Sequence, residues 1–136
     1  MLRVQPREVL LEVNAAFGRR DARGMVERFA PDAAVTDHRP GGLGSWRGRD
    51  ELLAYYAGIC DTALAIREDL EIVSERGAVV IADGVFNAQL SEDGGPEEFT
   101  LTYTLLAVVR DDLIQELGVH QDIAAATQAA PMPETS

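Results

Sequence analysis

The amino-acid sequence predicts an α+β fold, with helices in the first half of the chain and a sheet built largely from the second half. Hydrophobic residues in the first half recur at the three- and four-residue spacing of amphipathic helices. From about residue 65 onward they alternate with polar residues, as in strands with one buried face. Because helices and strands are segregated in this way, the 136 residues are expected to form one layered domain around a single hydrophobic core.

Three helices are expected in the first half of the chain. The first opens at Pro6 and ends at Gly18, and Asp21 can cap the second. The third begins at about Arg49. The inward-facing residues are Val9, Val13, Ala16 and Phe17 in the first helix, Met25, Val26 and Phe29 in the second, and Leu52, Tyr55, Tyr56 and Ile59 in the third. Each set occupies one side of its helix, so the helices are expected to pack against a common core.

Five strands are expected. One, at residues 33–38, precedes a loop at residues 39–46 in which one Pro and three Gly disfavour regular structure. The other four occupy residues 65–73, 78–90, 98–109 and 113–122, separated by turn signals. The two longest must coil, and a coiled sheet around helices leaves a concave side. Residues 1–123 are thus expected to form one domain, followed at residues 124–136 by a tail with a short helical end and a mobile terminus.

The charge of the chain excludes some classes of partner. The net charge is −11, and all twelve basic residues are Arg. Such a surface repels nucleic acids and anionic membranes, whose binding requires clustered positive charge. No apolar run approaches a membrane span and no secretory signal is visible, so a cytoplasmic location is expected. The single cysteine, Cys60, excludes an internal disulfide and a cysteine-built metal site.

Two stretches of the sequence resemble a known family. Residues 29–42 read Phe-Ala-Pro-Asp-Ala-Ala-Val-Thr-Asp-His-Arg-Pro-Gly-Gly, and residues 46–53 read Trp-Arg-Gly-Arg-Asp-Glu-Leu-Leu. Together with the order of elements, they resemble the SnoaL-like branch of the NTF2-like superfamily over residues 6–123. The resemblance implies a cone in which three N-terminal helices pack in a strongly curved, mostly antiparallel sheet, with a pocket at the wide end. Members include ketosteroid isomerases, polyketide cyclases, epoxide hydrolases, dehydratases and proteins with no known reaction, so function must be argued from the site.

Asp37 is the residue most favoured for chemistry. On an alternating strand it shares a face with Ala33 and Val35, the apolar positions expected to face the pocket. The resemblance aligns it with the proton-shuttling carboxylate of ketosteroid isomerases, which follows a Val-X pair as Asp37 does here. A carboxylate against apolar walls acquires a pKa suited to a base. The alternative is that Asp37 only ends the strand and caps the loop, and a salt bridge to Arg39 would contradict the catalytic role.

The partners that the resemblance implies for this base are absent. Val13 stands where ketosteroid isomerases have a tyrosine in the oxyanion hole, and Leu105 stands where they have a protonated aspartate. Neither side chain can donate a hydrogen bond to a developing enolate. Asn14 and Tyr103 are the nearest residues that could substitute. The aspartate of polyketide cyclases on the last strand is likewise replaced, by Val119.

The two histidines, His38 and His120, have different expected positions. His120 is a candidate pocket acid or base from the wall opposite Asp37, because its ordinary pKa suits proton transfer near neutrality. A partly exposed structural histidine is the alternative. His38 follows Asp37 on the strand and therefore points to the other face, so the two cannot share a metal ion. No metal site is expected.

Aromatic and apolar residues are expected to line the pocket. Trp46 is expected to close its mouth. The other predicted lining residues are Tyr55, Tyr56, Leu105, Val13, Val35 and Phe17. The alternative for the aromatic residues is a role in the core alone.

Two polar rows on the predicted strands remain unassigned. One row consists of Asp83, Asn87 and Gln89, which line either a polar pocket wall or a solvent-exposed outer face. Thr100, Thr102 and Thr104 form a face that suits either solvent or the sheet of a partner. The resemblance implies a homodimer formed through this outer sheet face.

The sequence allows two hypotheses about function. The first is a cofactor-independent acid–base enzyme of the isomerase, cyclase or dehydratase class, acting on a hydrophobic oxygenated metabolite such as a polyketide or terpenoid. It requires an enclosed, mostly apolar cavity. The second is a non-catalytic module for ligand sensing or dimerisation, for which a cone filled by side chains is expected.

Overall fold

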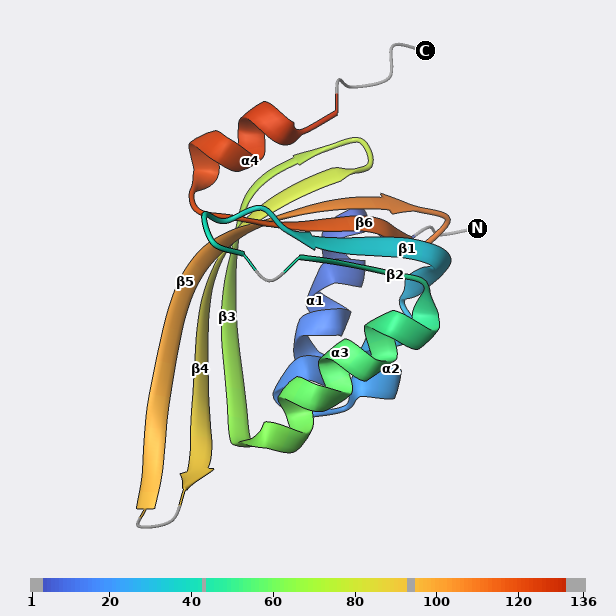
Figure 1. Cartoon of the computed structure of the whole chain (residues 1–136). Helices are drawn as coiled ribbons and strands as arrows, with labels where there is room; N and C mark the ends of the chain where they lie inside the picture. Colours follow the sequence, from blue (N-terminus) through green and yellow to red (C-terminus); the bar gives the residue numbers. More distant parts are fainter. Residues whose placement is uncertain (1–3, 43, 93–94, 132–136) are drawn as a thin grey trace.

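The computed structural model describes residues 4–42, 44–92 and 95–131 and consists of one curved sheet with helices on both of its faces (Figure 1). The helices are α1 (Pro6–Gly18), α2 (Ala22–Val26), α3 (Arg49–Thr62) and α4 (Ile123–Ala129). The strands are β1 (Phe29–Asp37), β2 (Ser45–Arg47), β3 (Ala63–Arg76), β4 (Val79–Glu92), β5 (Gly95–Arg110) and β6 (Leu113–His120). The predicted α+β architecture, with its first three helices in a strongly curved sheet, is confirmed.

The six strands follow the order β2-β1-β6-β5-β4-β3, in which only the β1–β6 pair is parallel. The strands β3, β4 and β5 have 14, 14 and 16 residues, which is far above the usual strand length. Strands of this length twist and coil, and Figure 1 shows them sweeping around the side of α1 and α3. The sheet therefore forms a half-cone with the helices inside it.

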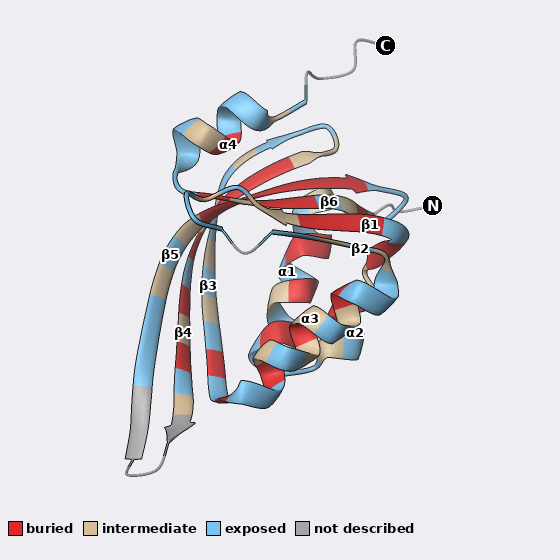
Figure 2. Ribbon diagram, viewed as in Figure 1, coloured by how far each residue is buried: buried red, intermediate tan, exposed pale blue. Residues whose placement is uncertain are grey.

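The helices bury the faces that the sequence predicts. Pro6 stands at the start of α1, and the Asp21 carboxylate accepts a hydrogen bond from the N–H of Gly24 at the start of α2. In α1 the predicted residues Val9, Val13, Ala16 and Phe17 are all buried. In α3, Tyr55 and Ile59 are only half-buried, unlike the buried Leu52 and Tyr56. Figure 2 shows the buried positions concentrated where these helices meet the sheet.

The first strand and the loop after it differ from the prediction. The strand β1 begins at Phe29 and runs through Pro31 with an irregular register, because Pro31 has no N–H for the ladder. At the end of the predicted loop, Ser45–Arg47 forms β2 and pairs with β1 at the sheet edge. Gly41 and Gly44 adopt positive φ angles of 72° and 116°, which let the chain reverse between the two strands.

The outer face of the sheet, opposite the cone interior, carries both polar rows of β4 and β5. The Thr104 hydroxyl donates to Asp83 and the Thr100 hydroxyl donates to Asn87, each at 2.8 Å. The polar row of β4 therefore lies on the outer face and does not line the pocket, since Phe86 and the other alternate residues of β4 face the helices.

The end of the chain covers part of this outer face. The predicted helical end is α4, which begins after the capping carboxylate of Asp122. Its Ala126 is fully buried against Ile81 and Leu106 in a second hydrophobic cluster. A homodimer through the outer face stays a prediction, and it must use the part that α4 leaves open. None of the described helices has the length and apolar character needed to cross a bilayer.

Ala126→Asp is expected to release α4 from the sheet, because it places a carboxylate in the cluster with Ile81 and Leu106. Hydrogen exchange measured by mass spectrometry should show faster exchange across residues 123–129, with little change in the cone. Ala124→Asp is the matched control, since Ala124 is exposed in the first turn of the same helix. Equal exchange in both variants would contradict the packing role of Ala126.

Candidate functional site

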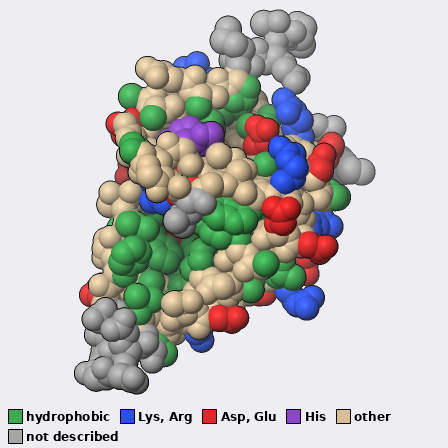
Figure 3. All heavy atoms as spheres, in the orientation of Figure 1, with side chains coloured by type: hydrophobic (Ala, Val, Ile, Leu, Met, Phe, Trp, Pro, Cys, Tyr) green, Lys and Arg blue, Asp and Glu red, His purple; other side chains and the backbone are tan. Residues whose placement is uncertain are grey.

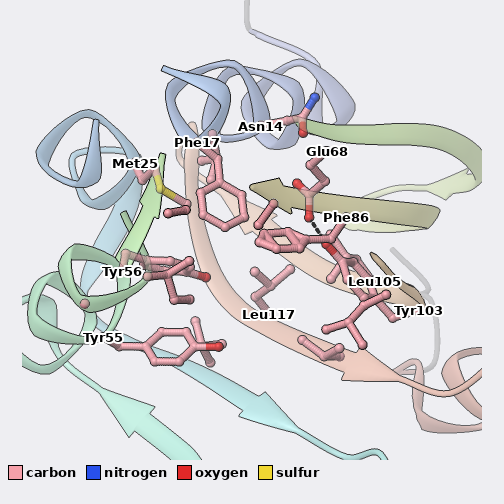
Figure 4. Close-up of a pocket in the computed structure, with 18 of the residues that line it drawn as sticks. Asn14, Phe17, Met25, Tyr55, Tyr56, Glu68, Phe86, Tyr103, Leu105 and Leu117 are labelled. Atoms are coloured by element: carbon pink, nitrogen blue, oxygen red, sulfur yellow. Dashed lines mark hydrogen bonds between the residues drawn. The ribbon is translucent and has the colours of Figure 1, made fainter. Parts of the chain in front are cut away.

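The concave side of the sheet and the inner faces of α1 and α3 enclose a cavity of about 530 Å³. This volume lies within the range of pockets that hold drug-sized molecules. Figure 3 shows a hollow lined by hydrophobic side chains between the long strands and α3. Its polar lining residues are Asn14, Arg39, Tyr55, Tyr56, Thr62, Glu68 and Tyr103. The cavity is therefore a mostly apolar chamber with a few polar groups, shown from inside in Figure 4.

Most of the predicted lining residues lie in its wall. They are Val13, Phe17, Val35, Tyr55, Tyr56 and Leu105, and the two candidate donors Asn14 and Tyr103 lie in the wall as well. Trp46 is the exception, and its prediction is wrong. Its ring stacks on that of Tyr55, with centroids 3.8 Å apart and an interplanar angle of 19°, and it is not among the lining residues. Trp46 lies on β2, an edge strand of the sheet, and supports Tyr55 from outside the cavity rather than closing its mouth.

A carboxyl–phenol pair stands in the wall where the three long strands lie side by side. Tyr103 of β5 pairs with Gly84 of β4, which in turn pairs with Leu70 of β3. A Cβ atom on Gly84 would lie 2.6 Å from the Tyr103 ring, so only glycine lets this ring lie across β4. The Tyr103 hydroxyl reaches β3 in this way and donates a hydrogen bond to Oε2 of Glu68 (Figure 4).

The surroundings of this pair keep both groups protonated to higher pH than usual. Burial raises the pKa of the Glu68 carboxyl, and the hydrogen bond from Tyr103 offsets only part of that rise. Burial raises the pKa of Tyr103 far above its ordinary value, and the nearby Glu68 raises it further. Glu68 is therefore a carboxyl group that can take up or return a proton inside an apolar chamber.

Asn14 lies in the same wall, on α1. Its Oδ1 atom is buried and makes no hydrogen bond with the described residues. Figure 4 shows the Asn14 side chain on the side of the cavity that carries Glu68. A buried amide oxygen without a partner costs free energy, so this atom is available to a ligand that carries a donor.

Asp37 does not lie in the cavity wall. Its carboxylate is bound in a fork by Arg39, whose Nε donates to Oδ1 at 2.9 Å and whose Nη2 donates to Oδ2 at 2.7 Å. The N–H of Arg39 also donates to Oδ1, at 3.1 Å. This salt bridge contradicts the predicted catalytic role of Asp37. The carboxylate instead caps the loop after β1, which is the alternative that the sequence allowed.

Arg39 takes the place in the cavity that Asp37 was expected to hold. Its guanidinium lies in the wall, with Cζ 5.8 Å from the centroid of the Tyr103 ring. The hydrogen bond with Asp37, and then the charge of that carboxylate, raise the pKa of Arg39 despite the opposing effect of burial.

The expected role of His120 in the cavity is also wrong. Val119 lines the cavity, so the next residue of β6 must face outward. His120 lies there in a second groove of about 280 Å³ beneath the end of α4, stacked on His38 with centroids 4.6 Å apart. Burial, and then the nearby His38, lower the pKa of His120. A structural role for His120 fits this position, although the residue is buried and not partly exposed as expected.

Sequence reasoning missed Glu68 and Arg39. A usable signal existed for Glu68, because it alternates in phase with Ile66 and Leu70, which belong to the core. A carboxylate in phase with apolar strand residues indicates a buried position. For Arg39 there was no comparable signal, since its direction depends on how the loop folds back.

The comparisons with known proteins agree with this geometry. Residues 10–117 match the SnoaL-like domain. The chain belongs to this family. No curated protein sequence matches it significantly. Among solved structures, TerC co-crystallised with polyporic acid is 21% identical, with a TM-score of 0.68 over 90% of this chain and 95% of the other.

Two further structures have the same fold. A putative polyketide cyclase from Xanthomonas campestris pv. campestris is 19% identical, with a TM-score of 0.69 over 88% of this SnoaL-like chain and 92% of the other. A protein with a ketosteroid isomerase-like fold from Catenulispora acidiphila, in complex with trimethylamine, is 18% identical. Its TM-score is 0.71, over 98% of this chain and 100% of the other. The predicted NTF2-like cone is thus confirmed, and at these identities the likeness extends to the fold alone.

Gly118→Ala is expected to destabilise the protein by about 1–3 kcal/mol, as overpacking usually does. A Cβ atom there would lie 2.8 Å from Nε2 of His120 and 3.2 Å from Cδ2 of His38. The free energy of unfolding in urea measures the effect. Gly58→Ala in α3 is the control, because a Cβ there meets nothing within 4 Å, and stability should rise by about 0.5–1 kcal/mol. A neutral Gly118→Ala would contradict the tight packing of the histidine pair.

Glu68→Gln is expected to stabilise the fold at pH 8 and to have little effect at pH 4. The folded-state pKa of Glu68 is raised, so its contribution to stability is present at acidic pH and is lost as the pH rises through that pKa. Glutamine keeps an acceptor for Tyr103 without the charge. Thermal unfolding across this pH range is the measurement, and a wild-type protein more stable than the variant at pH 8 would contradict it.

Proposed function

We propose that this SnoaL-like protein is a cofactor-independent acid–base enzyme of the isomerase, cyclase or dehydratase class. Its substrate is a hydrophobic oxygenated metabolite, such as a polyketide or terpenoid. The observation that carries the proposal is the hydrogen-bonded Glu68–Tyr103 pair in the wall of an otherwise mostly apolar cavity. This pair replaces Asp37 as the proposed reaction centre.

The chemistry of the pair supports proton transfer at carbon. In its ionised form, Glu68 takes a proton from the carbon next to a substrate carbonyl, and the electron pair of the broken C–H bond moves to the carbonyl oxygen. Once Glu68 is neutral it holds the Tyr103 hydroxyl less strongly, because a charged acceptor binds a donor better than a neutral one. The hydroxyl can then donate to the enolate oxygen. Glu68 returns its proton to another carbon in an isomerisation, or to a departing hydroxyl in a dehydration.

The size and lining of the cavity support a small hydrophobic ligand. A non-catalytic module was expected to have a cone filled by side chains, whereas this cone has about 530 Å³ of space. The structure of TerC with polyporic acid and the putative polyketide cyclase are consistent with such a ligand in this fold. Dimerisation and a cytoplasmic location stay predictions.

Glu68→Gln is expected to slow α-proton exchange of a bound ketone in D₂O by about 10²–10⁴-fold, because it removes the base. The measurement is NMR of deuterium uptake over a panel of hydrophobic ketones. Tyr103→Phe should slow exchange by about 10²–10³-fold through loss of a donor to the enolate.

Glu71→Gln is the matched control for this experiment. Glu71 lies on the same strand but is exposed and pairs with Asp83 on the outer face. Its variant should exchange at the wild-type rate. A Glu68→Gln variant that matches wild type, while its fold is intact by circular dichroism, would contradict Glu68 as the base.

A further inference from the structure

Arg39 brings a positive charge to the cavity wall, and no other lining residue among those that the structure describes is cationic. The rest of the lining is apolar or carries hydroxyl, amide or carboxyl groups. A cation in such a wall costs free energy unless a counter-charge is close. Asp37 supplies that counter-charge, but it occupies only part of the guanidinium.

A guanidinium group has two forked edges that can each bind an oxyanion, one formed by Nε and Nη2 and the other by Nη1 and Nη2. Asp37 binds the first edge, through both of its carboxylate oxygens. Nη1 of Arg39 makes no hydrogen bond within the described part of the chain. The second edge is therefore available to a ligand.

The position of Arg39 is fixed rather than adaptable. The Asp37 side chain is only 4% exposed, and the N–H of Arg39 also donates to it. Moving the guanidinium would leave a buried carboxylate without this partner, which is costly. Asp37 is thus a positioning residue, whose carboxylate holds Arg39 with one edge unused.

Arg39 and the reaction centre adjoin the same side chain. The Cζ atom of Arg39 lies over the Tyr103 ring, 5.8 Å from its centroid, and the hydroxyl of the same ring donates to Glu68. The guanidinium and the carboxyl are therefore linked by the Tyr103 side chain. A ligand that reaches both must extend along that side chain.

We propose that Arg39 anchors the substrate, and that substrates of this cavity carry an acidic oxygen at a site other than the carbon that reacts at Glu68. The acidic group is a carboxylate, an enolate or an acidic hydroxyl, each of which fits the free edge of the guanidinium. The inference rests on the proposed function, because it takes Glu68 and Tyr103 as the reaction centre. It goes further by assigning the charge of the substrate and the residue that selects it.

The test compares two ligands of the same shape and different charge, naphthalene-2-carboxylate and naphthalene-2-carboxamide. Trp46 provides the signal, because it is the single Trp and stacks on Tyr55 in the cavity wall. Calorimetry gives an independent affinity. Wild-type protein is expected to bind the carboxylate about tenfold or more tightly than the amide, despite its net charge of −11.

Arg39→Gln is expected to abolish this preference while changing the affinity for the amide by less than about threefold, since the amide makes no ion pair. Arg39→Lys should keep part of the preference, because it retains the charge without the fork. Arg67→Gln is the control, since the Arg67 side chain is 76% exposed on β3. It should leave the affinities for both ligands unchanged.

The inference is wrong if wild-type protein does not prefer the carboxylate, including the case in which neither ligand binds at millimolar concentration. It is also wrong if Arg39→Gln keeps the preference or weakens both ligands equally. Because the readout is binding, it is separable from the proposed function. A lost preference in Arg39→Gln, together with unchanged proton exchange in Glu68→Gln, would overturn the proposed reaction and leave the anchor standing.

Discussion

Strand alternation in the coiled sheet is the constraint on which the rest of the structure depends. Each residue of β3, β4, β5 and β6 must face either the cone or the outer surface, and the pairing of the strands fixes which rows coincide. Tyr103 and Glu68 meet because both belong to inward rows and Gly84 lies between them. His38 and His120 meet on the other side for the same reason. The sheet thus creates two separate groupings of polar residues from one alternating pattern.

The polar groups inside the cone lower the stability of the folded protein. Glu68 is buried enough that its charged form is disfavoured, and the buried amide oxygen of Asn14 lacks a partner among the described residues. A protein selected for stability alone would have apolar residues at such positions. Local conflicts of this kind, in a chain that otherwise follows its patterns closely, are typical of functional sites.

Much of the fold could be predicted because its signals are local. Helical spacing identified the buried face of α1, and alternation identified the long strands within a few residues of their ends. The short β2 was not predictable, because an edge strand of three residues in a Gly-rich segment depends on its pairing with β1. The family resemblance, carried by residues 29–53, added the curvature and closure that periodicity cannot supply.

The site was predicted only in part, and the failures have physical causes. Alternation was sufficient to place Val35, Tyr103 and Leu105 in the wall. It does not determine which side chains meet across strands, so the Glu68–Tyr103 contact had no sequence signal. Asp37 failed because its partner comes from a loop whose path is set by glycine conformations and β2 pairing. The expectation for His120 conflicted with the inward position of its neighbour Val119, and alternation alone could have corrected it.

The position of β3 at the edge of the sheet has a consequence for how molecules of this protein meet. An edge strand of 14 residues leaves a long row of unpaired backbone groups, which can recruit the strand of another molecule and start aggregation. Its outward row carries charged side chains, among them Arg67, Asp69 and Glu71. A second β3 brought alongside would bury these charged side chains and partly desolvate them, which is unfavourable. Growth of the sheet past this edge is therefore disfavoured.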